Sequence, residues 1–374
     1  MRVLIATDKF KGCMSAAVAA NAIANALRRT LPGVVCDICP IADGGEGTVE
    51  AVVAARNGGW REVETRDARS RHVRSRYGLL RDGGTLEAVM EMSAASGLAM
   101  VSDLPSDPAT ASTYGTGMML RDAIGLQVAR IIIGIGGSAT NDAGIGMAAA
   151  LGYRFLDAGG SSLEPVIRNM NRLAKIESPE TGEFPAILVA CDVANPLLGV
   201  DGCTRVFGPQ KGVNDFGFYE SRLQHLADII ERDFGVDHRQ VPGAGAAGGL
   251  GFGLMAFCGA KLTGGFDLIA AIMGLRDRVA AADLVITGEG RLDIQTLHGK
   301  GPIGVARMAR ALNKPVAAFA GIIEDPDPLN YHFDLLHAIK PDTMPLAEAM
   351  RHGPQLLEAA VADRSSAIAA LLKS

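Results

Sequence analysis

Short apolar runs and longer amphipathic segments alternate at both ends of the chain. Near the start, the pattern predicts strands at 3–6, 34–40 and 61–65 and helices at 16–31 and 45–55. Near the end, it predicts strands at 284–287, 316–320 and 335–339 and helices at 301–312 and 354–372. Such alternation is typical of a parallel sheet that helices cover on both faces. We therefore expect the two ends to share one doubly wound α/β sheet.

The middle of the chain has a different pattern. Residues 73–77 and 86–92 predict longer strands that suit antiparallel pairing, and short helices broken by glycine-rich loops follow them. A chain of 374 residues also exceeds the length that one hydrophobic core usually serves. The prediction is two α/β domains, one formed by residues 1–66 and 283–374 and one inserted between them, residues 67–282.

One stretch of the inserted domain joins an apolar strand to a glycine turn. Residues 131–133 are all isoleucine, which suits a strand buried on both faces. Three glycines that allow a ligand to approach the backbone come next: Gly134, Gly136 and Gly137. Ser138 or Thr140 is expected to cap a helix that runs to Leu151, and the free amides of its first turn would favour phosphate. The alternative is a tight turn whose glycines serve packing only, because no complete P-loop or dinucleotide fingerprint is present.

Composition and charge narrow the class of protein. Hydrophobic residues make up 48% of the chain, and 36 basic residues against 41 acidic ones give a net charge of −5. This balance gives no reason to expect nucleic acid or an acidic membrane surface as a partner. The six cysteines lack the spacing of a metal site, and no signal segment or membrane span is apparent. We expect a cytoplasmic protein that binds a small anionic ligand.

Charged residues follow several predicted strands directly. Asp8 and Asp43 come after the first two strands, Lys11 lies in the turn beyond Asp8, and Asp192 follows the apolar run 187–190. Open α/β sheets hold ligands at the carboxyl ends of their strands, so these side chains are candidates for catalysis. Asp192 could act as a base or as a Mg²⁺ ligand. The alternative is that the aspartates only cap helices or turns.

Further candidates lie in three glycine-containing stretches. Residues 208–212 contain Lys211, residues 243–249 offer a second helix start that suits an anion, and residues 287–293 crowd Glu289, Arg291 and Asp293 into one turn. The seven histidines lack the glycine-x-serine-x-glycine partner of a hydrolase. Acids, a lysine, an arginine and glycine-rich anion sites together favour phosphoryl transfer, in which the protein positions phosphates and Mg²⁺.

Seven motifs run in one order along nearly the whole chain. They are Asp8 with Lys11, ADGGEGT at 42–48, GIGGSATNDAG at 134–144, ACDVANPLLG at 190–199, FGPQKG at 207–212, PGAGAAGG at 242–249 and TGEGRLD at 287–293. This combination closely resembles the glycerate kinase type 1 family. The resemblance implies an ATP- and Mg²⁺-dependent kinase acting on D-glycerate. It also implies a flavodoxin-like domain built from both chain ends and an inserted domain related to the restriction-endonuclease fold.

Site residues follow from the stretches above. The expected catalytic residues are Asp192, Asp43, Lys11 and Arg291. The residues expected to bind ATP are Gly134, Gly136, Gly137, Ser138, Thr140, Asn141, Lys211, Gly245 and Gly248. Asp293 and Glu289 are the expected Mg²⁺ ligands. Lys11 and Arg291 would bind the substrate carboxylate or stabilise the phosphoryl group in transfer.

Three alternatives accompany this prediction. The resemblance favours phosphorylation of the 2-hydroxyl of glycerate, and a kinase that forms 3-phosphoglycerate stays open. An oxidoreductase would need a complete dinucleotide fingerprint, which the chain lacks. A metabolite-binding regulator would need no such set of acids beside phosphate sites. The sequence also leaves a homo-oligomer open.

Overall fold

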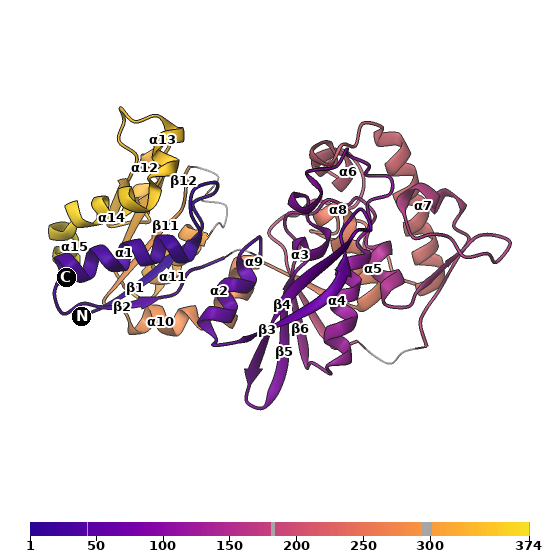
Figure 1. The fold of residues 1–374 in the computed structure, drawn as a ribbon, viewed down its shortest axis with the longest axis horizontal. Helices are drawn as coiled ribbons and strands as arrows, with labels where there is room; N and C mark the ends of the chain where they lie inside the picture. Colours follow the sequence, from indigo (N-terminus) through magenta and orange to yellow (C-terminus); the bar gives the residue numbers. More distant parts are fainter. Residues whose placement is uncertain (43, 181–183, 294–295, 297–300, 374) are drawn as a thin grey trace. The chain divides into compact units, whose positions relative to one another are not determined.

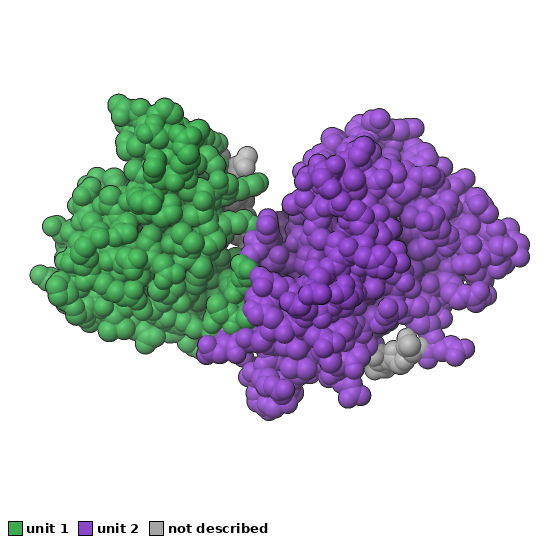
Figure 2. All heavy atoms as spheres, in the orientation of Figure 1, with its two compact units in different colours: residues 1–43, 50–55, 266–374 green, residues 44–49, 56–265 purple. Residues whose placement is uncertain are grey.

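The protein is described here by a computed structural model that covers residues 1–42, 44–180, 184–293, 296 and 301–373. Its chain divides into two compact units, unit 1 with residues 1–43, 50–55 and 266–374 and unit 2 with residues 44–49 and 56–265 (Figure 2). Helices α2 (Thr48–Ala55) and α9 (Gly265–Ile272) carry the chain from one unit to the other. The two units are described separately below.

Unit 1 contains a five-stranded sheet in the order β15-β13-β11-β1-β2, and every pair is parallel. Its strands are β1 (Arg2–Thr7), β2 (Val35–Ile38), β11 (Leu284–Gly288), β13 (Val316–Ala320) and β15 (Leu335–Ala338), and β12 (Arg291–Leu292) pairs with β14 (Ile322–Ile323) outside the sheet. Numbered along this unit, the order is 2-1-3-4-5, which is the flavodoxin-like order of a doubly wound sheet. The prediction that both chain ends build one parallel sheet is confirmed.

Helices cover this sheet on its two faces (Figure 1). They are α1 (Ala16–Thr30), α10 (Leu275–Ala281), α11 (Gly301–Ala311), α12 (Pro326–Asn330), α13 (Leu346–Arg351), α14 (Gly353–Asp363) and α15 (Ser365–Leu371). Ile23 and Leu27 of α1 share a buried core with Leu357 and Val361 of α14, and α11 packs against β1, β11 and β13. Burial of both faces explains why β11 and β13 are buried along their whole length.

Unit 2 contains a six-stranded mixed sheet in the order β10-β9-β6-β5-β4-β3. Its strands are β3 (Gly59–Arg66), β4 (His72–Asp82), β5 (Thr85–Glu91), β6 (Arg130–Gly134), β9 (Ala186–Ala190) and β10 (Lys261–Thr263), beside a small pair of β7 (Arg154–Leu156) with β8 (Lys175–Glu177). Strands β10, β9, β6 and β5 are parallel, whereas β3, β4 and β5 form an antiparallel meander. The antiparallel pairing predicted for 73–77 and 86–92 is therefore confirmed.

One strand lies in a different sheet from the one predicted. Residues 61–65 were expected to join the sheet of the chain ends, but they belong to β3, which pairs with β4 from Gly59 to Arg66. The reason is local. A short hairpin connection joins β3 and β4, so their pairing costs less loop-closure entropy than pairing with a strand that is distant in sequence.

The helices of unit 2 surround a second apolar core, which contains the isoleucines of β6. They are α3 (Ser93–Ser96), α4 (Tyr114–Gly125), α5 (Ile145–Ala150), α6 (Cys203–Phe207), α7 (Phe216–Phe234) and α8 (Ala246–Cys258), with 3₁₀ turns η1 (Ala99–Val101), η2 (Ile167–Arg172) and η3 (Pro209–Lys211). Both units thus combine helices with largely parallel strands, and the predicted α/β class is confirmed. Within the described residues, no helix has the length and apolar character needed to cross a membrane.

Candidate active site

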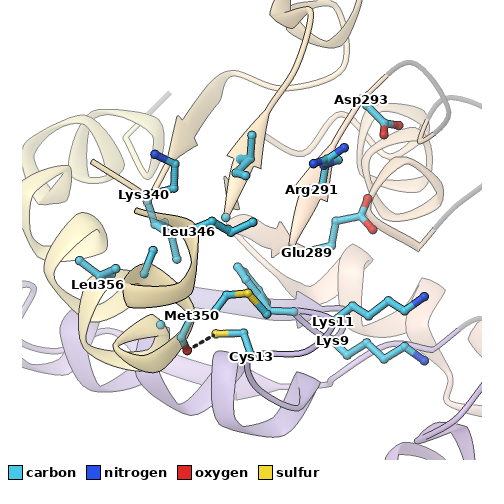
Figure 3. A pocket seen from close by; sticks show the side chains of 17 residues that line it. Lys9, Lys11, Cys13, Glu289, Arg291, Asp293, Lys340, Leu346, Met350 and Leu356 are labelled. Atoms are coloured by element: carbon cyan, nitrogen blue, oxygen red, sulfur yellow. Dashed lines mark hydrogen bonds between the residues drawn. The ribbon is translucent and has the colours of Figure 1, made fainter. Parts of the chain in front are cut away.

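A cavity of about 400 Å³ lies in unit 1, where the strands of the parallel sheet end. Lys9 and Lys11 reach it from the turn after β1, Glu289 to Asp293 from the segment after β11, and Lys340 from the segment after β15 (Figure 3). The carboxyl edge of an open α/β sheet is the usual ligand-binding side of this fold. The structure therefore brings together Lys11 and Arg291, which come from opposite ends of the sequence and were both expected at the site.

The cavity carries charges of both signs. Arg291 Nη1 forms an ion pair of 3.4 Å with Glu324 Oε1, and both side chains are about half exposed. Lys11 is exposed and forms no ion pair with any residue that the structure describes. An exposed cation whose ion pair is weak, or that forms none, can bind an anionic ligand at little cost in free energy.

Glu289 and Asp293 offer their carboxylates to the same hydroxyl. Thr296 Oγ1 lies 3.2 Å from Glu289 Oε1 and 3.4 Å from Asp293 Oδ1, and the Thr296 amide donates to Asp293 Oδ1 at 3.1 Å. No group of three or more possible metal ligands occurs among the described side chains. Mg²⁺ in phosphoryl-transfer enzymes usually takes one or two carboxylates and completes its shell with phosphate and water, so this pair fits it.

Two aspartates that follow β1 and β2 were expected near the site. Asp8 is buried, and its Oδ1 accepts a hydrogen bond of 2.6 Å from the amide of Lys9. This contact is of the turn-capping kind that the sequence left open for it. Asp43, an expected catalytic residue, lies outside the described residues.

In unit 2, several glycine-containing loops meet at the carboxyl ends of three neighbouring parallel strands. Glu91, Gly134 and Ala190 are in register at the ends of β5, β6 and β9. A Cβ on Gly134 would lie 2.2 Å from the carbonyl oxygen of Gly44, and a Cβ on Gly44 would lie 2.6 Å from the Cβ of Ala190 and 3.3 Å from its carbonyl oxygen. Only glycine permits such close approach, so the ADGGEGT, GIGGSAT and ACDVANP segments are packed backbone against backbone.

The loop after β6 exposes amides to solvent. Gly136 and Gly137 are exposed, Gly137 has φ of +74°, and a Cβ there would meet only Ser93, at 3.6 Å. Among the described residues, no hydrogen bond uses the amides of Gly136, Gly137 or Ser138 as donors. Neighbouring free N–H groups in a glycine turn can form an anion-binding concavity, so phosphate binding at this stretch stays a prediction.

The helix beyond this loop begins later than predicted. Neither Ser138 nor Thr140 caps it; α5 starts at Ile145 after Ala143 and Gly144, whose φ angles of +48° and +77° are left-handed. A right-handed helix cannot include such residues, so it begins after them. With six residues, α5 is too short to create the dipole-assisted phosphate site that was expected, and the loop amides remain as the candidate donors.

Lys211 forms hydrogen bonds to the loop that follows β6. Its Nζ donates to Ser138 Oγ and to the carbonyl oxygen of Thr140, both at 2.6 Å, and its side chain is only 3% exposed. Burial lowers the pKa of Lys211 from 10.5 to about 8, while the nearby Cys203 and Asp142 act in the opposite direction. Lys211 was expected to bind ATP. The geometry instead shows it bonded to the loop that was expected to bind phosphate.

Thr140 and Asn141 are fully buried. The Asn141 amide donates to Thr204 Oγ1 at 3.0 Å. Thr140 Oγ1 and Asn141 Oδ1 have no hydrogen-bond partner in the described part of the chain. Buried polar atoms without partners are uncommon and are often found beside functional sites.

Asp142 was given no role from the sequence, although it belongs to the quoted GIGGSATNDAG motif. Its carboxylate is fully buried and accepts bonds from the amide and hydroxyl of Thr113, both at 2.9 Å, and from the amide of Gly144 at 3.2 Å. Burial raises the pKa of Asp142, and these hydrogen bonds oppose the shift. Asp142 therefore fixes the far end of the glycine loop. An acid directly before an Ala-Gly pair was the signal that could have identified it.

Asp192 and Asn195 lie in the loop after β9. Asp192 is exposed, and its Oδ1 accepts a bond of 2.6 Å from the amide of Gly265, the last residue of unit 2. Asn195 Nδ2 donates to the carbonyl oxygen of Asp201 at 2.8 Å, within its own loop. Lys211 is not among these hydrogen-bond partners, because its ammonium is bonded to Ser138 and Thr140.

Gly245 and Gly248 are buried at the start of α8. A Cβ on Gly245 would lie 2.2 Å from the carbonyl oxygen of Pro196, and one on Gly248 would lie 1.9 Å from that of Thr140. Both were expected to bind ATP. Their geometry supports a packing role that holds the loops after β6 and β9 in place.

A cavity with cations and paired carboxylates at the carboxyl edge of a parallel sheet, in a protein that also carries a glycine-rich anion loop, suits an enzyme that handles phosphate groups. A family model described as the glycerate kinase family matches residues 3–369. The chain therefore belongs to the glycerate kinase family, and it is an enzyme of the class that transfers phosphoryl groups to alcohols.

Individual relatives agree with this assignment. A protein named glycerate kinase from Bacillus subtilis (strain 168) is 42% identical and covers 98% of both chains. A protein named glycerate 2-kinase from Escherichia coli (strain K12) is 43% identical over 87% of this chain and 86% of its own. A solved structure under the name glycerate kinase 2 from Salmonella typhimurium LT2 superposes with a TM-score of 0.88 at 40% identity and covers 100% of both chains.

Proposed function

We propose that this protein uses ATP and Mg²⁺ to phosphorylate D-glycerate. The observation that carries the proposal is the cavity of unit 1, which is lined by Lys11, Arg291, Glu289 and Asp293. Phosphoryl transfer requires little covalent chemistry from the protein, but it requires cations near the phosphate oxygens and a metal site. This cavity supplies both kinds of group.

Lys11 and Arg291 are proposed to bind anionic groups of the substrates. Glu289 and Asp293 are proposed to hold Mg²⁺, which when bound neutralises charge on the phosphates. The exposed amides of Gly136 and Gly137 are proposed donors to phosphate oxygens, held in place by Lys211 through Ser138 and Thr140. Asp192 is proposed to orient the attacking hydroxyl, since its carboxylate is exposed directly after β9, where its Oδ1 accepts the amide of Gly265.

The 2-hydroxyl is the proposed acceptor, giving 2-phosphoglycerate. Support comes from the relative of Escherichia coli (strain K12), whose name is glycerate 2-kinase and which is 43% identical over most of this chain. Regiochemistry depends on how the protein orients a small substrate with two hydroxyls.

The test is turnover of ATP by the purified protein with and without D-glycerate, with the product examined by ³¹P NMR. Phosphate on the secondary carbon couples to a single proton and gives a doublet, whereas phosphate on the terminal carbon couples to two and gives a triplet. A glycerate-dependent doublet supports the proposal, and a triplet would mean a 3-phosphoglycerate-forming kinase. Binding of glycerate without any turnover would point to the regulator instead.

A further inference from the structure

The cavity of unit 1 has an apolar side that a bound glycerate molecule would not need. Leu346 and Met350 of α13 and Leu356 of α14 line it, together with Ile322 and Ile339 beyond β13 and β15. Figure 3 shows Leu346, Met350 and Leu356 on one side of the cavity and the ends of Lys9, Lys11, Glu289 and Asp293 on the other. A glycerate molecule carries a carboxylate and hydroxyls and has no apolar part large enough to cover this side.

The apolar wall is held in place by specific contacts. Cys13 Sγ donates to the carbonyl oxygen of Met350 at 3.2 Å, which ties the turn after β1 to α13. A Cβ on Gly12 would lie 2.8 Å from the Met350 methyl, so these two segments are closely packed. These contacts fix the wall through the protein's own packing, as is usual for binding pockets.

The exposure of Leu346 suggests that a ligand covers this wall. It is 49% exposed although it borders a cavity lined by other apolar side chains. A large aliphatic side chain left half in water gains free energy when a flat apolar group covers it. One such side chain alone would mean little, but here it lies in the same cavity as two cations suited to phosphate, Lys11 and Arg291.

We propose that this cavity is the ATP site, with the adenine base against Leu346, Met350 and Ile339 and the phosphate chain directed to Lys11 and Arg291. A nucleoside triphosphate has an apolar planar end and a polyanionic end, which matches the two sides of the cavity. The volume of about 400 Å³ lies within the range of small-molecule sites. The inference rests on the proposed kinase function, and it assigns the nucleotide to unit 1.

The test is direct binding, measured by calorimetry with the non-hydrolysable analogue AMP-PNP and Mg²⁺, for Leu346→Asp and Lys11→Met. Leu346 is the first residue of α13 and is half exposed, so an aspartate there favours the helix and should not prevent folding. The matched control is Tyr331→Asp, which changes an 85% exposed residue of the same unit that does not line the cavity. Adenosine is titrated in parallel, because it carries the base without the phosphates.

Leu346→Asp should weaken both adenosine and AMP-PNP about 10-fold or more, because it places a charge against the base. Lys11→Met should weaken AMP-PNP and leave adenosine unchanged, and Tyr331→Asp should change neither. The inference is overturned if Leu346→Asp binds AMP-PNP like the parent, or if its defect appears only in the KM for glycerate. If the parent binds AMP-PNP with this pattern but phosphorylates no glycerate, the proposed function fails while the nucleotide site stands.

Discussion

The ammonium of Lys211 lies 2.6 Å from the hydroxyl oxygen of Ser138 and reaches the Thr140 carbonyl at the same distance, while its side chain is almost completely buried. Burying a lysine is costly unless its donors are satisfied. These two bonds join η3 to the loop that follows β6, two segments more than 70 residues apart. Lys211 is thus placed to fix the shape of the exposed amide loop without itself being exposed to a ligand.

Lys211→Met should reduce kcat/KM about 100-fold, because the loop amides lose their support, which is the size of effect that follows loss of a positioned oxyanion donor. Steady-state kinetics with both substrates would measure this, alongside the melting temperature. Lys175→Met is the control, since Lys175 is an exposed lysine that pairs with Glu177. If Lys211→Met melts like the parent and keeps its activity, the loop does not depend on Lys211.

Activity should fall as the pH rises through about 8, where Lys211 loses its proton. The ionisable groups beside it are Asp142 and Cys203, and burial raises the pKa of the Cys203 thiol to about 12, so this thiol does not titrate in the same range. The unfolded chain keeps the lysine proton to about 10.5 and therefore binds more protons than the folded chain between these values, so this group's contribution to the free energy of unfolding rises with pH.

Above pH 8, deprotonation of Lys211 should therefore lower the activity while its contribution to the free energy of unfolding rises. A pH–rate profile and urea unfolding at matched pH values would measure both quantities. Lys211→Met should lack the alkaline limb near pH 8. An identical limb in parent and variant would assign the titration to another group.

Gly137→Val should cripple catalysis, because the side chain would crowd the exposed amides and the backbone has φ of +74°. We expect a loss of about 100-fold or more in kcat/KM with the fold retained. Gly33→Val is the control for backbone strain, since Gly33 has φ of +87° and open space around it. Equal kinetics for the two folded variants would remove the loop from the active site.

Gly248→Ala should destabilise the protein more than Gly259→Ala. The two glycines have similar φ angles of +67° and +62°, but only at Gly248 would the new Cβ meet backbone, the Thr140 carbonyl oxygen at 1.9 Å. The difference in unfolding free energy should be about 1 to 3 kcal/mol, the usual cost of overpacking. Denaturant titration would measure it, and equal losses would mean that the Gly248 contact relaxes freely.

Asp192→Asn separates a structural role from a catalytic one. An asparagine keeps the oxygen that accepts the Gly265 amide at 2.6 Å, so a purely structural role predicts little change in kcat. A role as base or metal ligand predicts a loss of about 100-fold or more. A Mg²⁺ titration then distinguishes the two, since only a lost ligand raises the metal requirement. Turnover within a few-fold of the parent at saturating Mg²⁺ would shift the role to Asp43 or Asp293.

Three features of this protein could be predicted from its sequence: the α/β class, the parallel sheet shared by both chain ends and the position of the charged turn at 287–293. Each of these depends on local information: apolar runs of strand length, helix-length amphipathic segments, and the rule that parallel strands place their following turns at one edge. Seven motifs in order also identified the family, because their combination is specific although each is short.

The contacts of the individual motif residues could not be predicted in this way and were found only in the folded chain. Lys211, Gly245 and Gly248 are residue types that often bind anions, and the sequence therefore suggested a ligand site. In the structure Lys211 is buried against Ser138, Gly245 against Pro196 and Gly248 against Thr140. Asp142, unassigned before, is the buried acid that fixes the glycine loop. The physical reason is that burial and hydrogen-bond partners come from segments tens of residues apart. A glycine suits either backbone packing or anion binding, and a lysine can bind either an anion or the protein's own oxygens, so the role depends on neighbours that the sequence does not show.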